Sequence, residues 1–131
     1  MRFLLASLLA LTLGLLTPVT AGDDSTAGVG LSYTITTLTA GQIAFFTVDG
    51  ATPGGLVLIG YSTRGAGPTQ TPYGLVAMTP PIHTLATLIA DSAGTATFTP
   101  FVPNFPGVTL YTQAYDDAGG NLTNALVETI Q

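Results

Sequence analysis

His83 is the only histidine in the sequence, and a hydrolase that needs a base at neutral pH would have to use it. The segment GYSTRG (60–65) places Ser62 in a context close to Gly-x-Ser-x-Gly, the turn that exposes a nucleophilic serine. Arg64 stands where that turn has its second glycine, and no helical pattern follows, although the turn requires one. We therefore predict that Ser62 and His83 form no catalytic pair and that the chain is not an enzyme.

Three oxygen-bearing side chains lie on one predicted turn, DDAGGN (116–121). Asp116, Asp117 and Asn121 are ligand types that Ca²⁺ prefers, although calcium needs six to eight oxygens. The alternative is that they only shape the turn, by hydrogen-bonding to nearby backbone. With one histidine and no cysteine, the sequence excludes a usual zinc site. Calcium at this turn is thus the only metal hypothesis, and no cofactor is expected.

Tyrosine side chains combine a flat apolar ring with a polar tip, which suits the face of a sugar or a small ligand. Two groups of candidates stand out, one alternating along a predicted strand near the C-terminus and one flanking a Gly- and Pro-rich segment. The candidate ligand-binding residues are Tyr111, Gln113, Tyr115, Tyr61, Tyr73 and Arg64. The alternative is that these side chains merely cover the outside of a sheet, because scattered exposed aromatic residues are normal.

The elements that would position these residues are all predicted strands. Short runs rich in Thr, Val, Ile, Phe and Tyr alternate with Gly, Pro, Asp and Asn, which favours strands joined by turns. Period-two alternation places Ala96 and Phe98 on one face, and Leu110, Thr112 and Ala114 on one face. The predicted strands are 30–38, 42–49, 56–62, 75–78, 83–90, 95–102, 108–116 and 122–130. This pattern predicts an all-β fold, an antiparallel two-sheet β-sandwich of about seven or eight strands.

Two turns give the strongest local signals. Asp91-Ser92-Ala93-Gly94 and the segment 116–121 are each predicted to join two strands as a tight antiparallel hairpin. The segment 64–73 is predicted to be the longest inter-strand loop, because its glycines and prolines discourage strand and helix. It also holds Arg64, the one cation expected in the processed chain, so it is the first place where a specific binding site is expected.

The N-terminus predicts export. Arg2 precedes an apolar run at 3–16, and Val19 and Ala21 are suitable for cleavage, so residues 1–21 are predicted to be a signal peptide. A transmembrane anchor is the alternative, but the run is shorter than the roughly 20 residues that cross a bilayer. We expect a flexible segment at 22–29, a single domain at 30–131, and no membrane span after cleavage. The predicted location is secreted or at the cell surface.

Charge is scarce and mostly negative. Seven acidic residues stand against Arg64 after the signal, and lysine is absent. Nucleic acid is excluded as a partner, because neutralising phosphates takes several basic side chains. Long Thr-rich strand edges without lysine are poorly protected against pairing, so self-association through sheet edges is expected.

Three segments carry a resemblance to a known family. YTQAYDDAGGNLTNALVETI (111–130), ADSAGTATFTPFVP (90–103) and GQIAFFTVDGATPGG (41–55) resemble strand and hairpin segments of immunoglobulin-like and fibronectin type III-like modules in exported bacterial proteins. The chain departs from antibody domains in having neither a cysteine pair nor tryptophan. The resemblance implies a β-sandwich, a structural, adhesion or assembly role, and a protein or glycan partner at the cell envelope. The alternative function is a carbohydrate- or small-ligand-binding module built on the tyrosines and the Arg64 loop.

Overall fold

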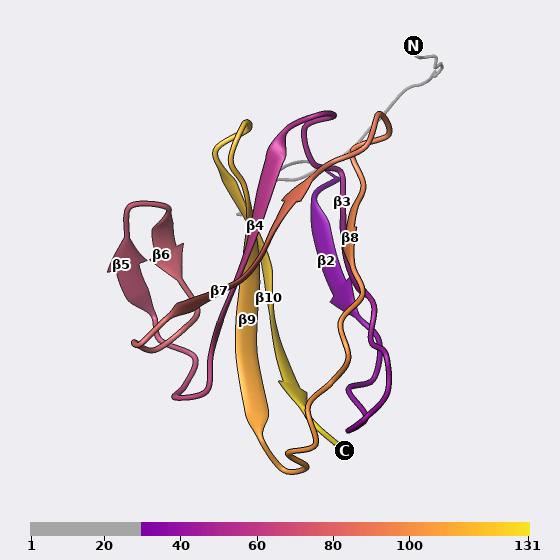
Figure 1. The fold of residues 1–131 in the computed structure, drawn as a ribbon. Coiled ribbons are helices and arrows are strands. Elements are labelled where there is room, and N and C mark those ends of the chain that lie inside the picture. The colour runs from indigo at the N-terminus through magenta and orange to yellow at the C-terminus, as the bar shows by residue number, and fades with distance from the viewer. Residues whose placement is uncertain (1–29) are drawn as a thin grey trace.

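A computed structural model describes residues 30–131 of the chain (Figure 1). The predicted signal peptide at 1–21 and the predicted flexible segment at 22–29 lie outside the described residues. No part of residues 30–131 is helical, and every regular element there is a strand. Accordingly, the described part of the chain has no helix that is long and apolar enough to cross a membrane.

The strands follow the β-prone runs of the sequence, because β-branched and aromatic side chains suit a pleated, half-buried surface. Their bounds are β2 Ser32–Ile35, β3 Phe46–Asp49, β4 Leu56–Ser62, β5 Thr69–Thr71, β6 Gly74–Val76, β7 His83–Ile89, β8 Ala96–Phe98, β9 Thr109–Asp116 and β10 Asn121–Thr129.

All pairings between these strands are antiparallel. The larger sheet has the order β10-β9-β4-β7, the smaller sheet has the order β2-β3-β8, and β5 and β6 form a separate two-stranded hairpin. In Figure 1 the four-stranded sheet and the three-stranded sheet lie beside each other, and the β5–β6 hairpin projects from the four-stranded one. The predicted all-β, antiparallel character of the chain is confirmed.

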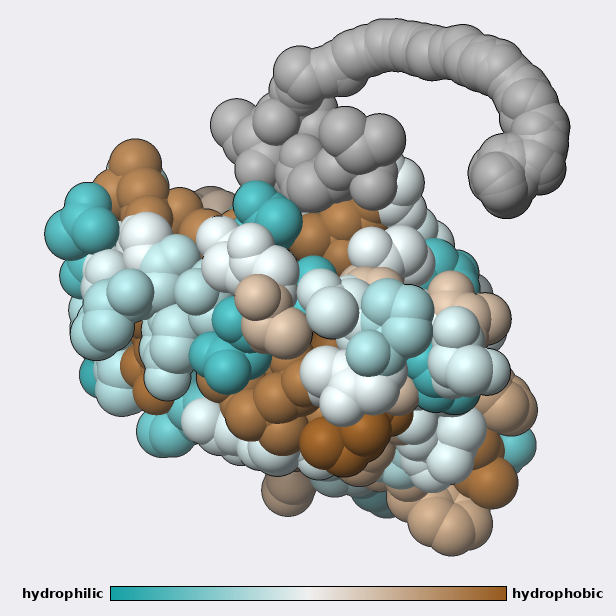
Figure 2. Space-filling view, turned by 90° about the horizontal axis from the view of Figure 1, so that it is seen from above, coloured by the Kyte–Doolittle hydropathy of each residue, from teal (hydrophilic) through white to brown (hydrophobic). Residues whose placement is uncertain are grey.

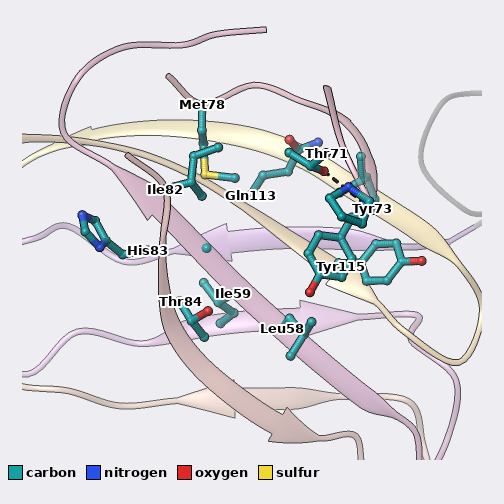
Figure 3. Close-up of a pocket in the computed structure, with 13 residues that line it drawn as sticks. Leu58, Ile59, Thr71, Tyr73, Met78, Ile82, His83, Thr84, Gln113 and Tyr115 are labelled. Carbon is teal, nitrogen blue, oxygen red and sulfur yellow. Dashed lines mark hydrogen bonds between the residues drawn. The ribbon is translucent and has the colours of Figure 1, made fainter. Parts of the chain in front are cut away.

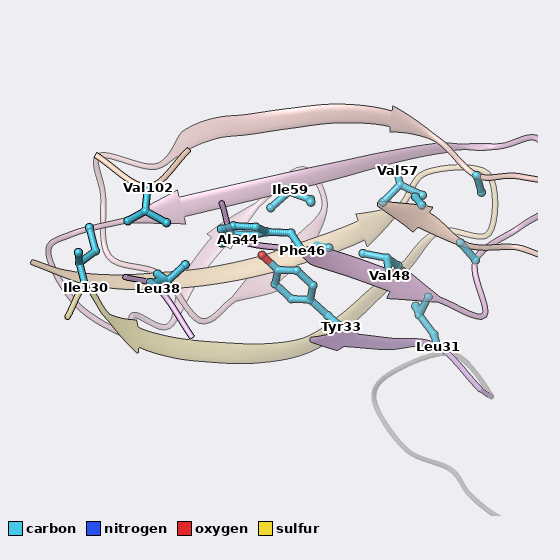
Figure 4. Close-up of a cluster of buried hydrophobic side chains, with 14 residues drawn as sticks. Leu31, Tyr33, Leu38, Ala44, Phe46, Val48, Val57, Ile59, Val102 and Ile130 are labelled. Carbon is cyan, nitrogen blue, oxygen red and sulfur yellow. The ribbon is translucent and has the colours of Figure 1, made fainter. Parts of the chain in front are cut away.

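The hydrophobic core draws side chains from both of these sheets. Val57 and Ile59 of β4 are fully buried, and Figure 4 shows them facing Phe46 and Val48 of β3. Burying one such side chain contributes roughly 1.5–3 kcal/mol, so this cluster is the main source of stability. The predicted alternation is confirmed for β9, where Thr112 and Ala114 are buried.

The predicted loop at 64–73 was wrong in part, because β5 lies inside it and pairs with β6. The turn between these two strands is held by the Thr71 side chain. Its Oγ1 donates to the carbonyl of Gly74 at 2.8 Å and accepts the N–H of Tyr73 at 3.1 Å. The three residues Thr69, Gln70 and Thr71 form a short strand because the Thr71 side chain closes the hairpin.

Two predicted strands are shorter than expected. The runs at 42–49 and 95–102 form regular strands only at β3 and β8, and beyond them an isolated bridge joins Ile43 to Phe101. Pro100 interrupts the regular ladder because it has no N–H, although its carbonyl accepts the N–H of Ala44 at 3.0 Å.

The two predicted hairpin turns had different outcomes. The turn at 116–121 joins β9 to β10 as a hairpin, as predicted. The turn Asp91–Gly94 was wrongly predicted to be a hairpin, because it carries the chain from β7 in the larger sheet to β8 in the smaller one. Asp91 Oδ1 accepts the N–H groups of Ala93 and Thr95, both at 2.9 Å, and Gly94 has a φ of 83°. Residues that favour a tight turn therefore do not determine whether the two strands beside it pair with each other.

Candidate functional site

A bulge in β10 organises the polar side chains at one side of the molecule. Leu122 pairs with Tyr115 and Ala125 pairs with Gln113, so Thr123 and Asn124 together oppose the single residue between those partners on β9. The Thr123 hydroxyl replaces the interrupted ladder, since its Oγ1 accepts the N–H of Ala114 at 3.0 Å and donates to the carbonyl of Asn124 at 2.8 Å. The bulge thus keeps its backbone hydrogen-bonded.

The same bulge aims Asn124 at the smaller sheet. Asn124 Oδ1 accepts the N–H of Tyr33 at 2.9 Å, and Asn124 Nδ2 donates to the carbonyl of Tyr33 at 3.0 Å. The side-chain amide therefore acts as one residue of a neighbouring strand and satisfies both outward backbone groups of Tyr33 on β2. This Asn124–Tyr33 bracket joins the edges β10 and β2.

Tyr33 ties the sheets a second time through its side chain. The ring is 1% exposed, and its hydroxyl shares a 2.8 Å hydrogen bond with Thr112 Oγ1 on β9. Thr112 Oγ1 also donates to the carbonyl of Gly60 at 2.6 Å, so Tyr33 Oη is the donor of the shared bond. Burial raises the pKa of the Tyr33 phenol well above its ordinary value.

Gln113 connects the bulge to the β5–β6 hairpin. Its Nε2 donates to the carbonyl of Thr123 at 2.7 Å, and its Oε1 accepts the N–H of Ala77, just after β6, at 2.9 Å. The amide therefore fastens the hairpin over the outer face of the larger sheet. Because both ends are used, Gln113 is a positioning residue for the hairpin.

The hairpin and the larger sheet enclose a cavity of about 260 Å³, which we call the hairpin cavity. Figure 3 shows Tyr73 and Tyr115 at one end of it, with ring centroids 4.9 Å apart and planes inclined at 55°. Leu58 lies across its floor, and Met78 lies on the far side from the tyrosines. This volume is close to the smallest pockets that hold small ligands.

A second cavity of about 310 Å³, the end cavity, opens where the two sheets separate. Its lining is almost entirely apolar and includes Leu85, Leu110 and Val102. Phe101 and Phe105 lie on its rim and are largely exposed. The side chains here offer few polar groups that could orient a ligand.

The structure divides the six predicted ligand-binding residues. Tyr73, Gln113 and Tyr115 line the hairpin cavity. Tyr61 lines the end cavity instead, and Arg64 and Tyr111 line neither of these two cavities. The six therefore do not line one cavity. The predicted loop at 64–73 meets β9 through Tyr73, which contacts Tyr115, while Arg64 itself lines neither cavity.

Ser62 and His83 are kept apart by the alternation of β4. Tyr61 pairs with His83, and their rings lie 5.3 Å apart, so both point to one face. The next residue, Ser62, points to the opposite face. There it is fully buried, its Oγ donates to the carbonyl of Thr79, and it accepts the N–H of Arg64 at 3.0 Å.

The three predicted calcium ligands are brought together only in part: the side chains of Asp116 and Asn121 both lie beside Gly119. Asp116 is 4% exposed, and its Oδ2 accepts the N–H of Thr52 at 3.2 Å and the Thr52 hydroxyl at 2.9 Å. Asp117 is exposed, and Asn121 Nδ2 donates to the carbonyl of Gly119 at 3.1 Å. Residues 30–131 contain no group of three or more acidic, histidine or cysteine side chains placed to hold a metal ion.

The opposite side of the larger sheet ends in β7. This strand lies beside β8 of the smaller sheet, but among residues 30–131 its backbone is paired only with β4. Its sequence HTLATLI contains no acidic residue, lysine, arginine or proline, and Ile89 is 65% exposed. The β7 edge therefore has none of the charged or proline residues that usually protect an exposed strand.

Other exposed hydrophobic residues are distributed over the surface. Figure 2 shows hydrophobic patches separated by hydrophilic residues on the face seen from above. The large exposed ones are Ile43, Phe45, Tyr73, Leu75, Ile89, Phe101, Phe105, Val108 and Val127. Four of them gather at one end of the molecule, because Phe101, Phe105 and Val108 line the end cavity and Ile43 bridges to Phe101.

No protein-family model, curated protein or solved structure matches this chain.

Proposed function

We propose that this chain is an exported, non-catalytic β-sandwich module that serves a structural, adhesion or assembly role at the cell surface or outside the cell. It joins another protein through the free backbone edge of β7. In this mode, main-chain hydrogen bonds supply the attachment, and no covalent chemistry is required.

The strand order supports an immunoglobulin-like or fibronectin type III-like architecture. Such sandwiches place their A, B and E strands in one sheet and their G, F, C and C′ strands in the other. The orders β2-β3-β8 and β10-β9-β4-β7 correspond to these two sets when the strands are taken in chain order. The β5–β6 hairpin is then an insertion between C and C′. One hydrophobic cluster shared by the two sheets fits this architecture.

The β7 edge is the observation that carries the proposed role. Within residues 30–131 it is a seven-residue strand paired on one side only, with no acidic residue, lysine or arginine and with an exposed isoleucine at its end. Ser62 and Gln113, two side chains that could do chemistry, are instead engaged in local hydrogen bonds. The placement of the chain outside the cell rests on the predicted signal peptide.

A pair of lysine substitutions tests the role in cells that export the chain. Ile89→Lys places a charge on the β7 edge, while Val127→Lys places the same charge at a similarly exposed position, 57% against 65%, on β10. We expect Ile89→Lys to release the protein from the cell surface into the medium and Val127→Lys to leave it attached. Equal retention of both variants would contradict the proposed role of β7.

A second candidate function is the binding of a small ligand or sugar residue in the hairpin cavity. The observation that favours it is the Tyr73–Tyr115 pair, which forms one wall of a half-open, mostly apolar space. On a glycan array, Tyr73→Ala and Tyr115→Ala should both abolish a signal that Tyr111→Ala preserves, because Tyr111 lies outside the cavity. A signal that is equally sensitive to all three substitutions would place the ligand elsewhere.

A further inference from the structure

The direction of the β7 backbone follows from the residue just after it. Ala90 N–H donates to the carbonyl of Gly55 at 2.9 Å, so the backbone of Ala90 points toward β4. Backbone direction alternates along an antiparallel strand. Leu88 and Ala86 therefore also point toward β4, while the N–H and C=O groups of Thr87 and Ile89 point away from it.

The regular part of this edge is short and well defined. Ile59 pairs with Ala86 and Gly60 pairs with Thr84, so Leu85 is the extra residue of a bulge. The hairpin also lies near the start of the strand, because Thr84 lines the hairpin cavity. The uninterrupted free edge therefore runs from Ala86 to Ala90, with Leu88 at its centre.

This edge is complementary to itself. If two copies meet antiparallel with a two-fold axis beside Leu88, Thr87 of each lies opposite Ile89 of the other. Those are the two residues with outward backbone groups, so each Thr87–Ile89 pair exchanges both of its N–H···O=C bonds. A two-fold axis repeats the same pair on its other side, as an isologous interface requires.

The side chains and charges agree with this register. Thr87 pairs with Leu58 and Ile89 pairs with Leu56, so both side chains lie on the outer face of the larger sheet. Across the axis, exposed Ile89 would lie against Thr87 of the second copy and lose contact with water. The nearest acid, Asp91, would face Leu85 of the second copy and not another carboxylate. The negative net charge of the chain therefore does not concentrate at the contact.

We infer that the partner of the β7 edge is a second copy of this chain, paired β7 to β7 about a two-fold axis at Leu88, with Thr87 opposite Ile89. This identification rests on the proposed function. The contact joins two four-stranded sheets into one continuous antiparallel sheet. An edge-to-edge contact buries less area than a standard interface, so the association is weak and depends on concentration.

Sedimentation of the purified, processed chain tests the pairing itself. We expect a reversible monomer–dimer equilibrium as the concentration rises toward millimolar. Ile89→Lys should weaken it by about tenfold or more, whereas Val127→Lys should leave it unchanged. A chain that stays monomeric over the whole range would overturn the inference, as would equal weakening by the two lysines.

A cross-linking experiment tests the register. The sequence contains no cysteine, so Thr87→Cys and Ile89→Cys each provide a single thiol. Directly opposed residues in an antiparallel pair are within the range of a disulfide. We expect a mixture of the two variants to cross-link more than either variant alone. Cross-linking that is no greater in the mixture would exclude this register.

The two proposals fail in different ways. If the purified chain is monomeric but Ile89→Lys still releases it from the cell surface, the β7 edge binds a different protein, and only the second-copy inference fails. If the chain dimerises as described but Ile89→Lys does not affect its surface retention, the pairing stands and the assembly role at the surface fails.

Discussion

The two sides of the larger sheet differ in how their edges end. At the β10 side, Asn124 fills both outward backbone groups of Tyr33 and joins the sheet to β2. At the β7 side, the neighbouring strand β8 is paired with β3 and, within residues 30–131, makes no backbone hydrogen bond to β7. The β10 side is closed at one point, where a side chain of β10 bonds to the backbone of Tyr33, and the β7 side has no such side-chain closure within residues 30–131.

Both edge strands contain a bulge, so the bulge alone does not explain the difference. The β10 bulge presents an amide, Asn124, whose donor and acceptor match a strand backbone. The β7 bulge presents Leu85, which packs against the hydrophobic core and lines the end cavity. The same backbone irregularity can thus close an edge or merely interrupt it, depending on the chemistry of one side chain.

The largest expected effect comes from opening the closed edge. Asn124→Ala leaves the N–H and C=O of Tyr33 without their partners in a half-buried position. We expect the free energy of unfolding to fall by about 2 kcal/mol, within the range for unsatisfied buried polar groups. Urea denaturation measures this loss.

The matched control is Asn121→Ala, which removes an asparagine whose side chain, within residues 30–131, makes only a local hydrogen bond to the carbonyl of Gly119. It should cost less than about 0.5 kcal/mol. Equal losses for the two alanine variants would show that the bracket does not stabilise the edge.

A smaller effect is expected at the second tie between the sheets. Tyr33→Phe removes the hydroxyl that donates to Thr112, while Thr112 keeps its bond to Gly60. The expected loss at neutral pH is about 1 kcal/mol, the usual net value of one hydrogen bond.

This substitution also has a pH signature. Burial raises the pKa of Tyr33 in the folded chain above the unfolded value of 10.0. Above pH 10 the unfolded chain therefore ionises Tyr33 while the folded chain does not, and stability falls by up to about 1.4 kcal/mol per pH unit. Tyr33→Phe removes this term, so the stabilities of the two proteins should converge between neutral pH and pH 11. A constant difference over that interval would contradict the burial of an un-ionised phenol.

The sequence was sufficient for part of the local structure, although it missed β5 and overestimated the lengths of β3 and β8. Alternation placed Ala96, Thr112 and Ala114 on the buried faces, because a strand repeats every two residues whatever its partner. The β9–β10 hairpin was predicted from its Asp, Gly and Asn residues, which set the turn locally. The same reasoning failed at Asp91–Gly94, since turn chemistry does not determine which sheet the next strand joins.

The candidate site was predicted only in part, because it depends on register between distant strands. Alternation placed Tyr111, Gln113 and Tyr115 on one face. It could not show that the Gln113 amide hydrogen-bonds to Thr123 and Ala77, because those partners come from β10 and from the segment after β6. Asn124 sits in an ordinary polar run, NLTNAL, and only the bulge in β10 turns it toward Tyr33. A weak signal was available in SYTI (32–35), where alternation puts a tyrosine in the core and its hydroxyl then needs a partner.

The smallest effect, and the most direct comparison of the two edges, is in the exchange of single amide hydrogens without any mutation. The N–H of Tyr33 points out of β2 but donates to Asn124 Oδ1, so it should exchange slowly. The N–H groups of Thr87 and Ile89 point out of β7 with no acceptor in the described chain, so in dilute solution they should exchange far faster than that of Leu88. NMR-detected exchange resolves all four amides.

The dependence of amide exchange on protein concentration then distinguishes the two edges. Raising the concentration should slow the exchange of Thr87 and Ile89 as copies pair, and should not change that of Tyr33, whose acceptor lies within the same chain. Uniformly slow exchange along β7 in dilute solution would mean that its outward groups already have partners, and the contrast between a closed and an open edge would then be lost.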